Sequence, residues 1–278
     1  MRVAEGLQQF VLHQHSAGDM DTAPLSLFFV NIDRYMQVKT TIKITNMNNN
    51  VTEFQERKTL IKKVIIRFTL LFIIVALLIL IPAGTINYWQ VYVYLGMLII
   101  PMVFIVFYFI NKDPEFLKRR LKTREKEKQQ KFVQLFFTLF FVAGFILPGL
   151  DKRFNWSDVP IWIIIATDIV ILLGYILIFF VFKQNSYAAR VVEVEKNQKV
   201  ISSGLYSIVR HPMYVGVLIM YIPTPLALGS YWGLIPMFVI PLALIIRINN
   251  EEKVLRQELP GYNEYCQKTK YRLIPFIW

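Results

Sequence analysis

The stretch GLYSIVRHPMYVG at 204–216 places a guanidinium, an imidazole and a proline directly before a long uncharged run. Arg210 and His211 are costly at the edge of a bilayer, because a charged group loses hydration there. Each could be an interfacial anchor, Pro212 could simply begin a helix, and the nearby tyrosines could form an aromatic belt. Those separate explanations do not account for the gathering of these residues at one depth. The stretch is therefore a candidate site for a polar ligand at the membrane surface.

A second polar segment, RINNEEKVLRQE at 247–258, follows the next uncharged run. In a helix, Arg247 and Glu251 share one face, and Glu252 is rotated from it by about 100°. The pair could be an ordinary ion pair where a helix leaves the membrane. Because the two polar segments flank one short apolar stretch, we expect residues 190–278 to form a single cavity that opens both to the cytosol and to lipid.

Composition indicates what must position these segments. The chain has 278 residues, 55% of them hydrophobic and only 19 acidic, and its mean hydropathy is +0.44. The apolar residues form continuous runs, which favours membrane helices over a barrel. The runs fall at 65–83, 88–110, 133–150, 160–182, 213–229 and 231–246. The expected fold class is all-α: a polytopic membrane protein of about six transmembrane segments, the last two a short hairpin, followed by a cytosolic helical segment.

Lysine and arginine are unevenly distributed between these runs. They crowd before the first run, between the second and third, between the fourth and fifth, and after the last; the alternate segments hold only Lys152 and Arg153. The positive-inside rule then places both termini and the Arg210–His211 segment in the cytosol. Insertion accounts for the net charge of +12, so membrane lipids are expected partners and nucleic acid is not.

The chain divides into three expected regions. Residues 1–55 are mixed and polar and predict a poorly ordered extension. Residues 56–189 hold four membrane helices and a basic cytosolic loop, and residues 190–278 form the expected catalytic region. Within the loop, 114–132 (PEFLKRRLKTREKEKQQKF) predicts a helix that lies on the anionic inner leaflet.

Two isolated residues need separate interpretations. Asp168 lies inside an apolar run with no basic partner, and we expect it to face the bundle, protonated or in contact with water, without a catalytic role. Cys266 is the single cysteine and belongs to no cysteine–histidine cluster, so no metal site is expected.

The motifs of the last third, taken together, resemble one family. RHPMYVG, preceded by SSGLY and followed by RxxxEE and then by GYNEYCQKTKYRLIP at 261–275, is similar to the isoprenylcysteine carboxyl methyltransferases, which are related to the phospholipid methyltransferases. The resemblance covers about residues 57–278. It is closest to the bacterial and archaeal branch, which shares the loop KDPEFLKRRLK at 112–122 and the YRLIPxIW ending. The implied location is a prokaryotic cell membrane.

The resemblance implies S-adenosylmethionine as cofactor, bound in a cytosol-facing pocket. Arg247 is implied to bind the methyl acceptor and to serve in catalysis. Where the eukaryotic enzymes have Gln and His, this chain has Glu193 and Gln198. The residues implied to contact the donor are Gln198, Lys199, Val200, Ile201, Tyr206, His211, Pro212, Met213, Tyr214 and Glu251.

The implied reaction is carboxyl O-methylation of an isoprenylcysteine-like or other hydrophobic or lipidated acceptor. A carboxylate is ionised at neutral pH and needs no general base, and the planar guanidinium of Arg247 suits it. A phospholipid amine acceptor would instead need a carboxylate such as Glu252 or Glu193. Two other classes stay open: a reductase that uses reduced nicotinamide, since sterol reductases carry a phrase similar to RHPxYxG, and a non-enzymatic membrane protein. The natural acceptor and the oligomeric state stay open too.

Overall fold

The computed structural model describes residues 25–121, 128–188, 194–195 and 198–278. Within these ranges the chain is helical or irregular and has no strand, which confirms the all-α class. It divides into two compact units, Met1–Lys58 and Thr59–Trp278, with the boundary inside helix α2 (Leu25–Ala83). Residues 25–55 of the expected extension are helical, residues 1–24 lie outside the described ranges, and the three-region division stays a prediction.

Five helices of the described chain are long and apolar enough to cross a membrane. They are Phe54–Ala83 of α2, α3 (Trp89–Lys112), Gln134–Phe154 of α5 (Lys128–Phe154), α6 (Ile161–Gln184) and Leu234–Glu258, which contains α10 (Leu234–Met237) and α11 (Ile240–Glu258). The described residues thus hold five candidate spans, and the expected count of about six is not confirmed. The remaining apolar run forms the short helices α8 (Pro212–Tyr221) and α9 (Thr224–Ala227).

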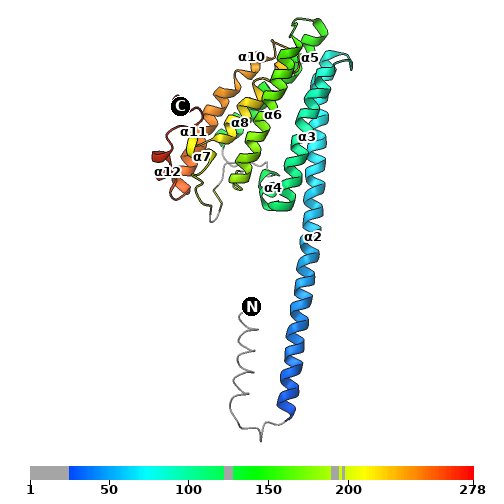
Figure 1. The fold of residues 1–278 in the computed structure, drawn as a ribbon, viewed down its shortest axis with the longest axis vertical. Coiled ribbons are helices and arrows are strands. Elements are labelled where there is room, and N and C mark those ends of the chain that lie inside the picture. The colour runs from blue at the N-terminus through cyan, green and yellow to red at the C-terminus, as the bar shows by residue number, and fades with distance from the viewer. Residues whose placement is uncertain (1–24, 122–127, 189–193, 196–197) are drawn as a thin grey trace. The chain divides into compact units, whose positions relative to one another are not determined.

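Prolines explain why this run is divided. Pro223 and Pro225 follow α8 at once, and a proline lacks the amide donor that a continuing helix needs. α8 instead packs closely on α6 through two glycines (Figure 1). A Cβ atom on Gly174 would lie 2.6 Å from Cγ of Met220, and one on Gly216 would lie 2.5 Å from Cγ1 of Ile178. The absent side chains therefore allow the contact.

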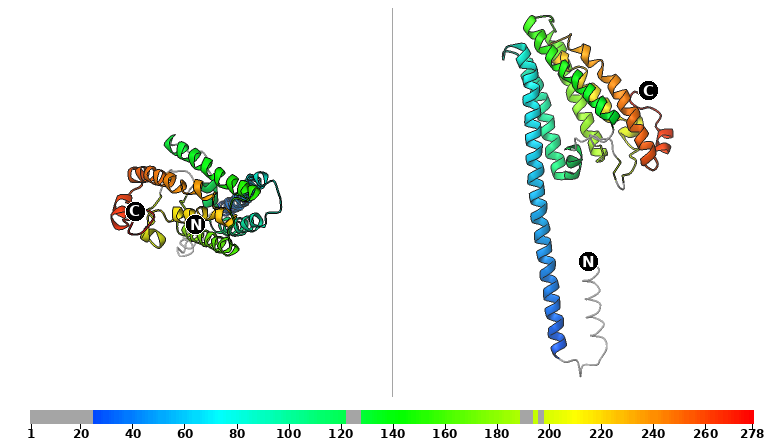
Figure 2. Two further views of the ribbon diagram at one scale, coloured as in Figure 1. Left: turned by 90° about the horizontal axis from the view of Figure 1, so that it is seen from above. Right: turned by 180° about the vertical axis from the view of Figure 1, so that it is seen from behind.

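Within the second unit, α6 packs on α3, α8 and α9, while α10 and α11 pack on α5. α4 (Pro114–Leu121), α7 (Leu205–Ile208) and α12 (Tyr262–Lys268) lie at one end of this bundle, and α10 lies at the other (Figures 1 and 2). The two polar segments of the last third thus meet at the α4–α7–α12 end.

The prediction that the basic loop forms a helix lying on the inner leaflet is wrong for α4. Phe116 and Leu117 are buried inside the protein, and the Phe116 ring lies 4.4 Å from the Phe109 ring and 4.9 Å from the Phe182 ring. The apolar side chains of α4 therefore cover the ends of α3 and α6, where they lose more water contact than on a membrane surface. Residues 122–127 of the loop lie outside the described ranges.

The opposite end of the bundle is fixed by a buried carboxylate. Asp151 accepts hydrogen bonds from the Ser157 amide at 2.7 Å, from the Ser157 hydroxyl at 2.6 Å and from the Ser230 hydroxyl. Deeper in the bundle, Asp168 of α6 is 4% exposed, and its Oδ1 has no hydrogen-bond partner among the described residues. Asp168 thus faces inward, as expected, and its role stays a prediction.

Candidate functional site

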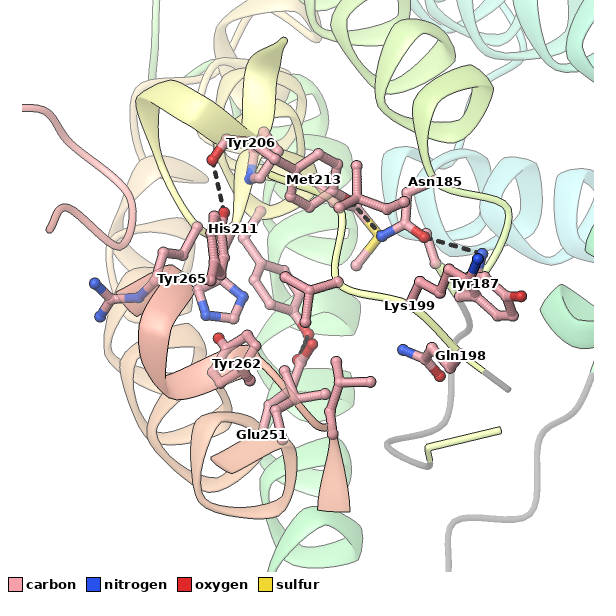
Figure 3. A pocket seen from close by; sticks show the side chains of 18 of the residues that line it. Asn185, Tyr187, Gln198, Lys199, Tyr206, His211, Met213, Glu251, Tyr262 and Tyr265 are labelled. Atoms are coloured by element: carbon pink, nitrogen blue, oxygen red, sulfur yellow. Dashed lines mark hydrogen bonds between the residues drawn. The ribbon is translucent and has the colours of Figure 1, made fainter. Parts of the chain in front are cut away.

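A pocket lies where α7, the first turn of α8, the middle of α11 and α12 converge. The space between its lining atoms, its open mouth included, is about 830 Å³. The structure brings together in its lining every residue predicted from the sequence, namely Gln198, Lys199, Val200, Ile201, Tyr206, His211, Pro212, Met213, Tyr214, Arg247 and Glu251. Figure 3 shows side chains from these separate segments around the cavity.

Local backbone pairing holds the Arg210–His211 segment in place. The Arg210 amide donates to the Tyr271 carbonyl and the His211 amide to the Arg272 carbonyl, each at 2.9 Å. His211 then caps α8, and Pro212 begins that helix at its first position, where no amide donor is needed. The end of the chain thus fixes the start of α8 at the pocket wall.

Glu252 is the centre of a buried ionic cluster. Its side chain is 2% exposed; Oε1 accepts from Nε of Arg210 at 2.7 Å and lies 3.2 Å from Nε2 of His211. Oε2 accepts from Nε of Arg272 at 3.2 Å and lies 3.6 Å from Nη2 of Arg256. We call Glu252 and these four partners the Glu252 cluster. Since an ionised carboxylate only accepts hydrogen bonds, Nε2 of His211 is the donor in its contact with Oε1 of Glu252.

Arg210 is satisfied within this cluster. Its Nη1 also donates to the carbonyls of Thr269 at 2.8 Å and Lys270 at 2.7 Å. Burial would lower the pKa of Arg210, but the hydrogen bond and the charge of Glu252 outweigh that effect and raise it. Although Arg210 reaches the pocket lining, its position is that of a structural cation rather than of a ligand-binding one.

Arg247 and Glu251 are connected through a tyrosine. Nε of Arg247 donates to the Tyr214 hydroxyl at 2.9 Å, and that hydroxyl donates to Oε2 of Glu251 at 2.6 Å. We call these three residues the Tyr214 bridge. All three line the pocket, and Arg247 and Glu251 are only partly buried. The bridge therefore presents a cation and an anion, at fixed positions, to the same cavity.

Tyrosines form much of the remaining wall. The Tyr265 hydroxyl donates to the Tyr206 carbonyl at 2.6 Å, and Nδ2 of Asn185 donates to the Tyr206 hydroxyl at 2.9 Å (Figure 3). Burial raises the pKa of Tyr206 to about 12, and burial followed by the charge of Glu252 raises the pKa of Tyr262. Both hydroxyls are therefore protonated at neutral pH. That of Tyr262 is buried and has no hydrogen-bond partner among the described residues.

Sequence reasoning missed part of this wall. Tyr262 and Tyr265 of α12 were not among the predicted site residues, although GYNEYC at 261–266 lies inside the motif that carries the resemblance. Asn185 and Tyr187, the polar residues that precede the donor loop, gave no signal, and Glu193 lies outside the described ranges. The lining residues that were not predicted are Asn185, Tyr187, Ala188, Leu255, Leu259, Tyr262 and Tyr265.

Comparisons with known proteins point to the same region. Residues 162–260, from α6 to just beyond α11, match the family model of the phospholipid methyltransferases. The chain is also 32% identical over 85 residues to a delta(14)-sterol reductase of Mus musculus, an alignment that covers 29% of this chain. The chain spans about a fifth of that relative's length, since the alignment covers 20% of it. Over residues 162–260 the chain is thus similar to the phospholipid methyltransferases, which supports a membrane methyltransferase.

Proposed function

We propose that this protein is an integral-membrane methyltransferase that uses S-adenosylmethionine and methylates the carboxylate of a hydrophobic or lipidated acceptor, such as an isoprenylcysteine. One observation carries the proposal. Residues that the resemblance assigns to the donor and the acceptor, distant in sequence, line a single pocket. Much of that pocket belongs to the segment that matches a methyltransferase family.

The pocket is proposed to open to the cytosol of a prokaryotic cell. Lys112 and Lys183 end α3 and α6 at the pocket's end of the bundle, whereas Lys152 and Arg153 end α5 at the opposite side. The excess of lysine and arginine in the segments that adjoin the pocket supports this orientation under the positive-inside rule, and both chain termini are proposed to be cytosolic.

The lining has groups suited to S-adenosylmethionine. The Tyr262 hydroxyl, which has no hydrogen-bond partner among the described residues, can make a polar contact with the donor. The Glu251 carboxylate can bind the donor's ammonium group, and the tyrosine rings of the lining can pack on its adenine ring. Tyr206 and the 198–201 segment would hold the adenosyl part. When bound, S-adenosylmethionine supplies a methyl group on a positively charged sulfur, whose C–S bond breaks as the acceptor oxygen bonds to the carbon, leaving a neutral thioether.

The chain's own contribution is alignment and the exclusion of water. Because an ionised carboxylate attacks without losing a proton, no general base is needed. Arg247, oriented by its bond to Tyr214, would hold that carboxylate, and Glu251 on the far side of Tyr214 would hold the donor. The hydrocarbon tail of the acceptor can stay in lipid while its carboxylate enters the pocket.

A phospholipid amine is the second candidate acceptor, favoured by the family match. An amine must lose a proton during methylation, and Glu252 was a candidate to receive it. Glu252 is instead enclosed by the side chains of Arg210, Arg256, Arg272 and His211, and it does not line the pocket. Among the described residues, this argues for carboxylate over amine.

A transfer assay with methyl-labelled S-adenosylmethionine tests the proposal. Purified protein receives either a prenylated cysteine with a free carboxylate or vesicles of phosphatidylethanolamine. Mild alkali releases methanol from a methyl ester and leaves an N-methyl amine intact, so volatile label distinguishes the products. We expect volatile label with the prenylated acid. Alkali-stable label on the lipid alone would establish the amine reaction, and oxidation of reduced nicotinamide without transfer would establish the reductase.

A further inference from the structure

Helix α4, from the basic loop between α3 and α5, contacts the pocket wall from outside. Nε of Arg119 donates to Oε2 of Glu195 at 2.8 Å, and its Nη1 donates to the Ser186 carbonyl at 3.1 Å. The guanidinium carbon of Arg119 lies 5.2 Å from the ring centre of Tyr187, which lines the pocket. The Arg119 side chain is only 18% exposed, so these contacts are partly shielded from water.

Arg120 makes a parallel set of contacts one residue later. Its Nη1 donates to the Ala188 carbonyl at 3.4 Å and lies 3.7 Å from the Met213 sulfur. Its guanidinium carbon lies 4.8 Å from the ring centre of Phe182 at the end of α6. Ala188 and Met213 both line the pocket. Two consecutive arginines of α4 thus contact the same part of the pocket wall, residues 186–188, from the side away from the cavity.

α4 is itself held firmly enough to act as a support. Asp113 caps its start, where Oδ1 accepts from the Phe116 amide at 3.0 Å, and Arg67 of α2 donates to the Leu121 carbonyl at its end. Between these caps, Phe116 and Leu117 are buried. The helix therefore presents its arginines from a fixed position.

The contact with Glu195 continues into the predicted donor loop. The Glu195 amide donates to Oε1 of Gln198, and the Gln198 amide donates to the Glu195 carbonyl, each at 3.0 Å. On the other side of the wall, the Tyr187 amide donates to Oδ1 of Asn185, whose Nδ2 holds the Tyr206 hydroxyl. A group that fixes Ser186 and Glu195 therefore also fixes Asn185 and Gln198.

We propose that α4 is a clamp in which Arg119 and Arg120 are positioning residues that hold residues 185–188, 194–195 and 198–201 in their ligand-binding shape. Charge-assisted hydrogen bonds from a planar guanidinium are well suited to this, because they fix both distance and direction. The expectation that the clamp strengthens S-adenosylmethionine binding rests on the proposed function. The expectation that it holds the pocket wall in place does not.

Hydrogen exchange of the ligand-free protein tests the clamp directly. Arg119→Gln should make the amides of Tyr187, Ala188 and Gln198 exchange roughly tenfold faster, since their local structure opens more often. Lys118→Gln is the matched control, because Lys118 is the preceding residue on α4 and pairs with Glu115, whose side chain is 62% exposed. Equal exchange in the two variants would overturn the clamp.

Donor titration by calorimetry is the second measurement. Arg119→Gln and Glu195→Gln should each weaken S-adenosylmethionine binding about fivefold, and the double variant should lose little more, because the two changes break one interaction. If Arg119→Gln does not fold, Arg119→Lys and Glu195→Gln carry the test. If Arg119→Gln exchanges faster than Lys118→Gln but the wild-type protein binds no donor, the proposed function is overturned and the clamp is kept. Donor binding equal in all variants would overturn the clamp and keep the function.

Discussion

Glu251 and Glu252 are adjacent on α11 and have opposite surroundings. Glu252 is 2% exposed and lies against three arginines and a histidine, so every oxygen is engaged. Glu251 is partly buried, accepts from Tyr214 and lines the pocket. The rotation of about 100° between neighbours on a helix is enough to separate them. One carboxylate thus builds the wall, and the other faces the space that the wall encloses.

The comparison also separates the two arginines that first drew notice. Arg210 belongs to the Glu252 cluster and bonds to the carbonyls of Thr269 and Lys270, whereas Arg247 belongs to the Tyr214 bridge. We therefore expect changes in the cluster to act on the fold and changes in the bridge to act on ligands.

The largest effect is expected for Glu252→Gln. It leaves Arg210 buried beside an uncharged partner, and breaking a buried ion pair costs about 3–5 kcal/mol of folding free energy. Thermal unfolding in detergent measures it. Glu258→Gln, at an exposed site near the end of the same helix, is the control and should melt like the wild type. Equal melting of the two variants would show that the cluster does not hold the fold.

Arg247→Ala should lower the transfer rate at least a hundredfold, since the acceptor is no longer aligned at attack distance (roughly the effect of a misplaced reactant). Its donor affinity should stay within about threefold of the wild type. Glu251→Gln should instead weaken donor binding roughly tenfold through the loss of a charge-assisted contact. Calorimetry and single-turnover transfer separate the two effects, and the reverse pattern would mean that the two roles are exchanged.

Tyr214→Phe removes the hydroxyl that joins the bridge and keeps the ring. We expect transfer to fall about tenfold and the free energy of unfolding to fall by only about 2 kcal/mol, the net size of the two hydrogen bonds that the hydroxyl makes. A loss of transfer rate that is large relative to the loss of stability would indicate that Tyr214 acts on the ligands rather than on the fold. A large loss of stability with unchanged transfer would place Tyr214 with the structural residues.

The smallest effect concerns Cys266 of α12, which lies among the charges of the Glu252 cluster. Burial raises the pKa of this thiol, although Arg210 lowers it, so little thiolate should form at a pH of about 8. Alkylation of Cys266 should be slower than alkylation of the exposed cysteine in the double variant Cys266→Ser, Lys268→Cys. Alkylation of Cys266 should be faster in Glu252→Gln, because the packing around the Glu252 cluster loosens. An unchanged rate would show that the reactivity of Cys266 does not depend on the cluster.

The sequence predicted the membrane helices because hydropathy is a local property. The pocket residues were predicted instead from the resemblance of the last third to the isoprenylcysteine carboxyl methyltransferases. The spacing of Arg247 and Glu251 was enough to place both on one face, but the link through Tyr214 comes from another helix and could not be read from it. The basic loop was misread because charge density does not distinguish an arginine that faces lipid phosphate from one that faces a carbonyl, as Arg119 and Arg120 do. The run at 213–229 was expected to be short because prolines interrupt it, and it forms helices too short to be a candidate span.

The most direct test of the pocket's identity is calorimetric titration of the purified protein in detergent with S-adenosylmethionine and, separately, with reduced nicotinamide dinucleotide. We predict saturable binding of the first at one site, weakened by Glu251→Gln and kept by Arg247→Ala, and no binding of the second. Saturable binding of the nicotinamide alone would contradict the account and favour a reductase.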